Sequence, residues 1–169
     1  RDSAIMADAA YMKGFYSTPP TIGLDAAGTH WAAWGTSPEW FRLGLHRDMG
    51  LENPTDFVEF FKNFVKTWDA NNLIALANTW QRNDVGMTAQ FDGNSEAALA
   101  SIRSDVLYMA CETDQYFHIE ALRWEAARMP DANFVIIPSL WGHMAGGGMS
   151  EVDASFINDR LTAFLKSEK

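Results

Sequence analysis

The sequence has little cysteine, few basic residues and no long apolar run. One cysteine in 169 residues excludes an internal disulfide framework and fits a reducing compartment. The formal net charge of −9 argues against nucleic acid or an anionic membrane as the main partner, since both are bound through basic patches. No apolar stretch approaches the roughly 18 residues of a membrane-spanning helix, and we expect no signal peptide. We therefore expect a cytoplasmic protein that binds neither nucleic acid nor membrane.

The sequence also lacks a pattern of metal ligands. His30, His46 and His118 do not stand at ligand spacing with cysteine or carboxylates, so we expect no metal site. Cys111 lies within an apolar run, which favours a buried side chain over a nucleophile. No cofactor is predicted.

Apolar residues are plentiful, at 47% of the chain with 21% charged, as in ordinary globular proteins. In residues 1–86 they recur mostly at helical spacing, and no strand pattern stands out. Asn53 and Pro54 favour a helix start, and the helix face that follows is aromatic. That face consists of Phe57, Phe60, Phe61, Phe64, Val65 and Trp68. The helices expected in this half span residues 2–13, 37–47, 54–69 and 71–81.

The pattern changes after a polar, glycine-bearing boundary from Gly86 to Ser95. Downstream, strands alternate with helices, which predicts an α/β fold with right-handed crossovers and a parallel sheet. Two parallel strands are too few to stand alone, because parallel sheets are buried on both faces. We therefore expect sequence outside this chain to complete the sheet. The expected elements are a helix at 96–102, a strand at 106–111, a helix at 119–129, a strand at 133–137 and a helix at 152–166.

Two residues able to do acid–base chemistry follow the two predicted strands. Asp114 comes just after the first strand, and His143 follows the second in a loop rich in glycine. Functional side chains collect at the carboxyl ends of strands in open α/β sheets. Asp after one strand and His after the next is also the order in which the acid and the histidine of an α/β-hydrolase triad run. The pair predicts a catalytic acid, Asp114, that orients a general base, His143.

Each residue also has a structural interpretation. Asp114 alone could cap the following helix, and His143 alone could be a hydrogen-bonded structural side chain. Glu112 competes for the role of acid, but its place at the end of the strand favours solvent exposure. The nucleophile that such a pair serves is missing, since no Gly-x-Ser-x-Gly turn occurs in the 169 residues.

Residues 1–14 read Arg-Asp-Ser-Ala-Ile-Met-Ala-Asp-Ala-Ala-Tyr-Met-Lys-Gly. This segment resembles the one that leads into the helical lid in the homoserine O-acetyltransferase family of α/β-hydrolases. Asp69-Ala70-Asn71 resembles a lid motif, and residues 139–143 resemble the histidine loop. The other matching positions are Phe15-Tyr16, Pro19-Pro20, Gly23-Leu24, and Thr113-Asp114 with Tyr116-Phe117 in the acid loop.

The resemblance implies the C-terminal part of an α/β-hydrolase, with residues 1–86 as a mostly helical lid and 87–169 as the last two parallel strands and helices of the core. Asp114 would be the triad acid and His143 the base of a serine-nucleophile enzyme. Such an enzyme hydrolyses esters or transfers acyl groups through an acyl-serine intermediate. Its partners would be a small ester or acyl donor and acceptor, and a missing N-terminal core that carries the serine. Homodimerisation through the lid helices would fit the family, and this chain alone should be inactive.

One position departs from the family. Members that acetylate homoserine usually carry Asp directly after the catalytic histidine, whereas this chain has Met144. An apolar thioether replaces a carboxylate that could meet a substrate ammonium group. Together with the aromatic lid, this favours a less polar ester or acyl acceptor than homoserine.

The alternative hypothesis is a non-catalytic interaction module, in which the helical first half presents its aromatic face to a partner. An exposed aromatic surface of that size would mark an interface.

Overall fold

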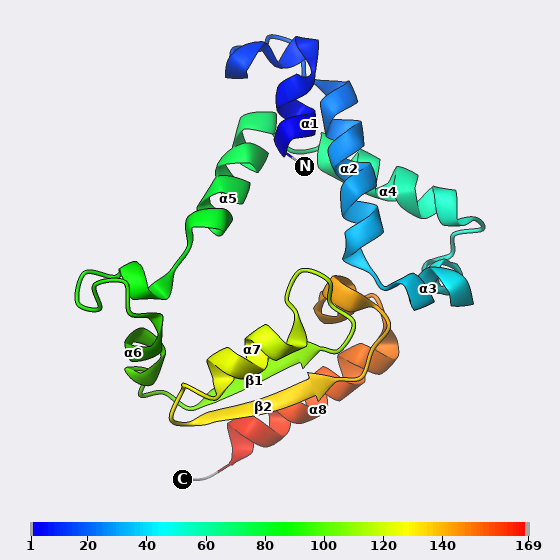
Figure 1. The fold of residues 1–169 in the computed structure, drawn as a ribbon. Coiled ribbons are helices and arrows are strands. Elements are labelled where there is room, and N and C mark those ends of the chain that lie inside the picture. The colour runs from blue at the N-terminus through cyan, green and yellow to red at the C-terminus, as the bar shows by residue number, and fades with distance from the viewer. Residues whose placement is uncertain (1, 168–169) are drawn as a thin grey trace. The chain divides into compact units, whose positions relative to one another are not determined.

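The computed structural model describes residues 2–167, which form two compact units (Figure 1). The first unit contains residues 2–34 and 44–83, and the second contains residues 35–43 and 84–167. No helix in the described part of the chain is both long and apolar enough to span a membrane.

The first unit is helical throughout. Its elements are α1 (Asp2–Ala7), the 3₁₀ segment η1 (Ala9–Gly14), α2 (Thr21–Gly35, of which Gly35 is grouped with the second unit), the 3₁₀ segment η2 (Leu45–Met49), α4 (Pro54–Lys66) and α5 (Ala70–Arg82). The helices predicted at 54–69 and 71–81 are confirmed, the first ending three residues early. Of the predicted aromatic face, Phe57, Phe61 and Val65 are buried. The other half of that face, Phe60, Phe64 and Trp68, is about two-fifths exposed.

Two predicted helices are broken in the structure. The helix expected at 2–13 stops at Ala7, because the side chain of Asp8 starts a separate turn by accepting the Ala10 N–H at 2.9 Å. The helix expected at 37–47 becomes α3 (Pro38–Leu43) and η2, because Gly44 at φ 69° lies in the left-handed region and ends α3.

Helix α2 was not predicted from the sequence, and two glycines explain why. Gly23 and Gly28 weaken the helical signal, but both mark close helix crossings. A Cβ at Gly23 would lie 2.6 Å from the Cα of Ile5, and one at Gly28 would lie 2.6 Å from the Cα of Lys62. The glycines therefore let α1 and α4 pack directly on the α2 backbone.

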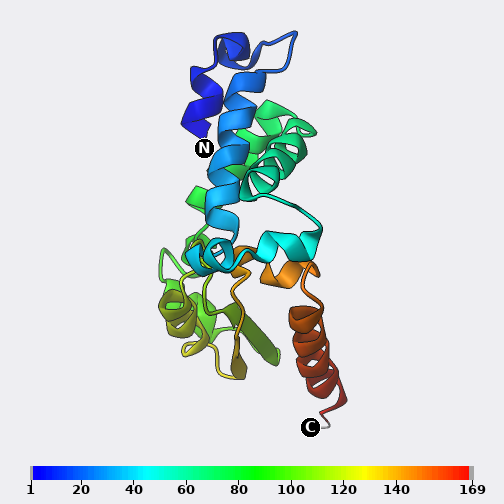
Figure 2. The same cartoon turned by 90° about the vertical axis from the view of Figure 1, so that its right-hand side faces the viewer.

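The second unit is built on a two-stranded parallel sheet. Strands β1 (Val106–Cys111) and β2 (Ala132–Ile137) pair in register from Val106 with Ala132 to Cys111 with Ile137. Helix α7 (Ile119–Ala126) lies on one face of the sheet and α8 (Glu151–Lys166) on the other, as Figures 1 and 2 show. The remaining elements are α3, the 3₁₀ segments η3 (Val85–Met87) and η4 (Gly142–Gly147), and α6 (Ser95–Ala100).

The strands agree with the prediction to within one residue, whereas the helix ends differ. Helix α7 ends three residues before the predicted 129, and α8 begins at Glu151 because Ser150 caps it by accepting the Asp153 N–H. Most strand residues are only half-buried, with full burial at Ala110, Cys111 and Ile137. The sheet edge where the strands end is thus its best-covered part within this chain.

Candidate active site

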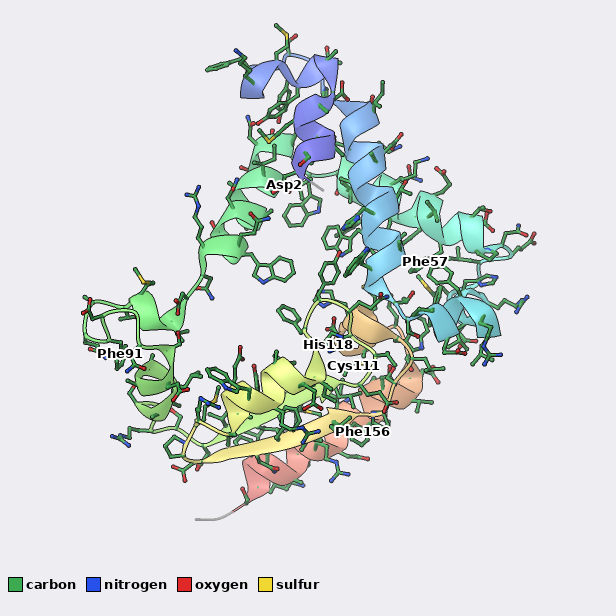
Figure 3. All side chains as sticks on the ribbon, viewed as in Figure 1. Asp2, Phe57, Phe91, Cys111, His118 and Phe156 are labelled. Carbon is green, nitrogen blue, oxygen red and sulfur yellow. The ribbon has the colours of Figure 1, made fainter. Side chains whose placement is uncertain are left out.

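The acid loop begins where β1 ends. Asp114 follows the strand by three residues, and its Oδ1 accepts the backbone N–H groups of Tyr116 at 2.7 Å and Phe117 at 3.1 Å. These bonds fold the loop into a tight turn. The N-cap of α7 is His118, not Asp114. The Asp114 carboxylate therefore stabilises the loop and does not cap the helix. Figure 3 labels Cys111 and His118, the two residues that flank this loop.

The histidine loop begins where β2 ends. His143 is the second residue of η4, directly after Gly142 at φ +56°. This backbone conformation favours glycine, and space also demands it, since a Cβ at Gly142 would lie 3.1 Å from the backbone of Thr36. The glycine thus allows the loop to turn sharply against the segment that precedes α3.

The two predicted site residues meet at this edge of the sheet. The Nδ1 of His143 lies 3.1 Å from the Oδ2 of Asp114, and their side chains are 29% and 9% exposed. The rings of Tyr116 and Phe117 lie 5.0 Å and 5.4 Å from the imidazole, measured between centroids. The imidazole is therefore held by one polar contact and two aromatic contacts, all from the acid loop.

Electrostatics keep Asp114 ionised. Burial on its own would raise the pKa of this carboxyl, but hydrogen bonds from His143 and from the N–H groups of Phe117 and Tyr116 outweigh it, and the pKa is lowered. An ionised carboxylate only accepts hydrogen bonds, so Nδ1 of neutral His143 must carry the proton. The other ring nitrogen, Nε2, is then the basic one.

A second layer of hydrogen bonds joins the two loops. The hydroxyl of Thr113 donates to the Ser139 carbonyl at 2.7 Å and accepts the Gly142 N–H at 3.2 Å. The Ser139 hydroxyl in turn donates to the buried carboxylate of Asp153 at 2.5 Å. Sequence reasoning placed Thr113 and Ser139 in the two loops by resemblance but did not predict these bonds, because their partners are backbone groups or residues distant along the chain.

Residues 36 and 37 also contact both loops. The Nε2 of Gln115 donates to the Thr36 carbonyl at 2.6 Å, and the Ser37 hydroxyl donates to the Leu140 carbonyl at 2.7 Å. Trp40 packs edge-on against Trp141, with 5.4 Å between ring centroids. No local sequence signal marks these contacts, which span between 79 and 103 residues.

Glu112 and Cys111, the other candidate residues of this segment, have different surroundings. Glu112 is exposed, as expected. Cys111 is buried and its Sγ donates to the Ser139 carbonyl at 3.4 Å. Burial raises the pKa of this thiol, which opposes formation of the nucleophilic thiolate.

The other histidines have different surroundings. His30 stacks on Trp34, His46 is buried with its Nε2 3.2 Å from the Glu52 carbonyl oxygen, and His118 is exposed. Among residues 2–167, no group of three or more His, Cys, Asp or Glu side chains is arranged to hold a metal ion.

The chain is similar in sequence to an ester hydrolase and to an acetyltransferase. The chain is 33% identical over 165 residues to an ethyl acetate hydrolase of Pseudomonas veronii, covering 96% of this chain and 46% of that protein. It is 31% identical over 101 residues to a homoserine O-acetyltransferase of Clavibacter michiganensis, covering 57% of this chain and 25% of that protein. The crystal structure of the acetyl esterase MekB superposes with a TM-score of 0.92 at 30% identity, over 98% of this chain and 48% of that one. No family model matches.

These relatives confirm the predicted resemblance and fold class. They are esterases and an acetyltransferase, and the structural match is to the C-terminal half of the α/β-hydrolase fold. The chain spans about half the length of the esterases it matches. The roles of Asp114 and His143 stay predictions, now with a geometry that suits them.

Proposed function

We propose that this chain is the C-terminal half of a serine-dependent ester hydrolase, in which Asp114 is the triad acid and His143 the general base. The observation that carries the proposal is the 3.1 Å contact between His143 Nδ1 and Asp114 Oδ2 at the carboxyl edge of the sheet, in a chain related to esterases. Residues 1–86 act as the lid, and residues 87–169 belong to the catalytic core.

The proposed mechanism follows from the ring tautomer. Nε2 of His143 takes the proton of a serine hydroxyl as the oxygen attacks the ester carbonyl, and Asp114 stabilises the imidazolium that forms. His143 then gives the proton to the departing alcohol, which leaves an acyl-serine. His143 next accepts a proton from the water that attacks the acyl-serine, and returns it to the serine oxygen as the acid leaves.

The proposed substrates are small, weakly polar esters such as those of acetate. One relative is named for ethyl acetate hydrolysis, and the half-buried Met144 beside the base provides no charge for an amino acid substrate. Transfer to an alcohol in place of water uses the same residues and is the second outcome that product analysis would distinguish.

The proposal requires an N-terminal core that contributes the serine, either joined to this chain or bound to it. We use "full-length protein" for the chain joined to that core. Homodimerisation through the lid helices and a reducing, cytoplasmic location belong to the same proposal, and sedimentation and fractionation of the full-length protein test them.

The direct test is substitution in the full-length protein. We expect Asp114→Asn to lower kcat for p-nitrophenyl acetate about 10⁴-fold and His143→Ala about 10⁶-fold. His118→Ala and Glu112→Gln, which change a histidine and a carboxylate at exposed positions, should retain the parental rate. Parental rates in His143→Ala or Asp114→Asn would refute the assignment.

The interaction module is kept as a second candidate on one observation. The side chains of Phe60, Phe64 and Trp68 are each about two-fifths exposed and lie on one stripe of α4 and its C-terminal end. Under this alternative, no N-terminal core restores esterase activity, and Phe64→Ala abolishes capture of a protein partner.

A further inference from the structure

Thr113 lies between the two loops that carry the acid and the base. Its hydroxyl donates to the carbonyl of Ser139 at 2.7 Å and accepts the N–H of Gly142 at 3.2 Å. Both the donor and an acceptor site of this one hydroxyl are therefore used. Each bond reaches a residue of the histidine loop, although Thr113 belongs to the acid loop.

One of these bonds joins residues that lie next to the acid and the base in the sequence. Thr113 immediately precedes Asp114, and Gly142 immediately precedes His143. The bond between them fixes the backbone on one side of the acid relative to the backbone on one side of the base. The two loops are therefore joined twice, by the 3.1 Å contact between the Asp114 and His143 side chains and by the bond between the Thr113 hydroxyl and the Gly142 N–H.

The Ser139 end of this connection is itself anchored. The Ser139 hydroxyl donates to Asp153 Oδ2 at 2.5 Å and accepts the Trp141 N–H at 3.0 Å, and both Ser139 and Asp153 are buried. Helix α8 thus holds Ser139 from one side while Thr113 holds it from the other. The Thr113 hydroxyl therefore connects the acid loop to a fixed point.

We propose that Thr113 is a positioning residue, whose hydroxyl sets the distance and angle between Asp114 and His143 without touching substrate. The proposal rests on the catalytic roles assigned above. Removal of the hydroxyl leaves the Gly142 N–H without this acceptor and frees the histidine loop to shift. Small displacements of catalytic groups cost rate more than binding.

The test uses Thr113→Val, Thr113→Ala and Thr113→Ser in the full-length protein. Valine keeps the shape and removes the hydroxyl, and alanine removes it without the bulk, in case the valine variant does not fold. Serine keeps the hydroxyl. We expect kcat for p-nitrophenyl acetate to fall about 10- to 100-fold in the valine and alanine variants, with KM within about twofold of parent, and to recover in the serine variant.

A spectroscopic readout separates positioning from general stability. The Nδ1–H proton of His143, identified by its loss in His143→Ala, should give a resolved low-field ¹H resonance in the parent and in Thr113→Ser. It should shift or broaden in Thr113→Val. The control is Thr67→Val, which removes a hydroxyl that likewise donates to a backbone carbonyl at 2.7 Å, and it should leave kcat and the resonance unchanged.

The outcomes distinguish the two levels of inference. Parental kcat in Thr113→Val together with inactive His143→Ala would overturn the positioning role and leave the proposed function standing. Serine and valine variants that are equally impaired would overturn it as well. Parental activity in His143→Ala would instead refute the proposed function itself.

Discussion

The two oxygens of Asp114 serve different partners. Oδ1 accepts two backbone N–H groups of its own loop, whereas Oδ2 contacts the imidazole. One oxygen therefore holds the carboxylate in place and the other directs the histidine. An asparagine at this position keeps the first function, since its carbonyl oxygen accepts hydrogen bonds, but an amide in place of Oδ2 gives up the charge.

This division predicts how acid affects stability. The pKa of Asp114 is lowered in the folded state, so its contribution is complete above the pKa of the unfolded chain, about 4, and is lost as pH falls through the folded pKa. At pH 7 we expect Asp114→Asn to reduce the free energy of unfolding by about 1.5–3 kcal/mol, the range for one charge-assisted hydrogen bond. Urea unfolding at decreasing pH should show this difference shrinking from about pH 5 downward. A constant difference, or equal shrinkage in the exposed Asp159→Asn, would contradict it.

The conformation of Gly142 and the space around it restrict the backbone of the histidine loop. Alanine there would have to adopt φ +56° and place its Cβ 3.1 Å from the Thr36 backbone. We expect Gly142→Ala to lower the stability of the full-length protein by about 1–3 kcal/mol and esterase kcat at least about 10-fold. Gly146→Ala in the same loop is the matched control, because no atom lies within 4 Å of a Cβ built there. Equal stability and rate in the two variants would remove the steric argument.

At the scale of elements, helix α4 has two aromatic stripes with different surroundings. Phe57 is 0% exposed and packs edge-on against Phe61, whereas Phe60, three residues along, is 39% exposed. Periodicity in the sequence marks both as apolar but cannot tell core from surface, since the aromatic residues extend beyond one helix face.

The pair Phe57 and Phe60 therefore makes a controlled comparison. We expect Phe57→Ala to cost about 3–5 kcal/mol of unfolding free energy, as for a fully buried phenylalanine, and Phe60→Ala to cost about 1 kcal/mol or less. Chemical denaturation of the full-length protein measures both. Similar losses would mean that the Phe60 ring is buried within the full-length protein, which would remove it from the exposed aromatic face.

The elements also show what sequence alone can predict. Short apolar runs with clear ends predict strands β1 and β2. Because functional side chains collect at the carboxyl ends of such strands, the strands in turn point to Asp114 and His143. Helix α2 escapes prediction because Gly23 and Gly28 oppose helix formation locally, and only their contacts with neighbouring helices explain them. The bonds of Thr113 escape prediction for a related reason, since its hydroxyl bonds backbone groups 26 and 29 residues away. Chemistry at strand ends is local, whereas the bonds that position it depend on tertiary structure.

At the scale of the whole molecule, the sheet is the incomplete part. Both strands are mostly half-buried within this chain, although parallel sheets are ordinarily covered on both faces and paired on both sides. The esterases that match are about twice as long. The proposed N-terminal core, which would pair with this sheet and supply the serine, accounts for both observations.

The acid and base, however, need nothing beyond the second unit to meet. Asp114, His143, Thr113 and Ser139 all belong to it, so the chain should carry an assembled but inert half of a catalytic site. We expect the chain alone to hydrolyse p-nitrophenyl acetate no faster than its His143→Ala variant. Addition of the separately produced N-terminal core should raise the rate to a plateau as its concentration increases, because the rate follows the fraction of chain that is bound and this fraction saturates. The same titration with the His143→Ala chain should stay flat. If the chain alone hydrolysed the ester at the rate of the full-length protein, its nucleophile would lie within these 169 residues. That result would overturn the two-part site.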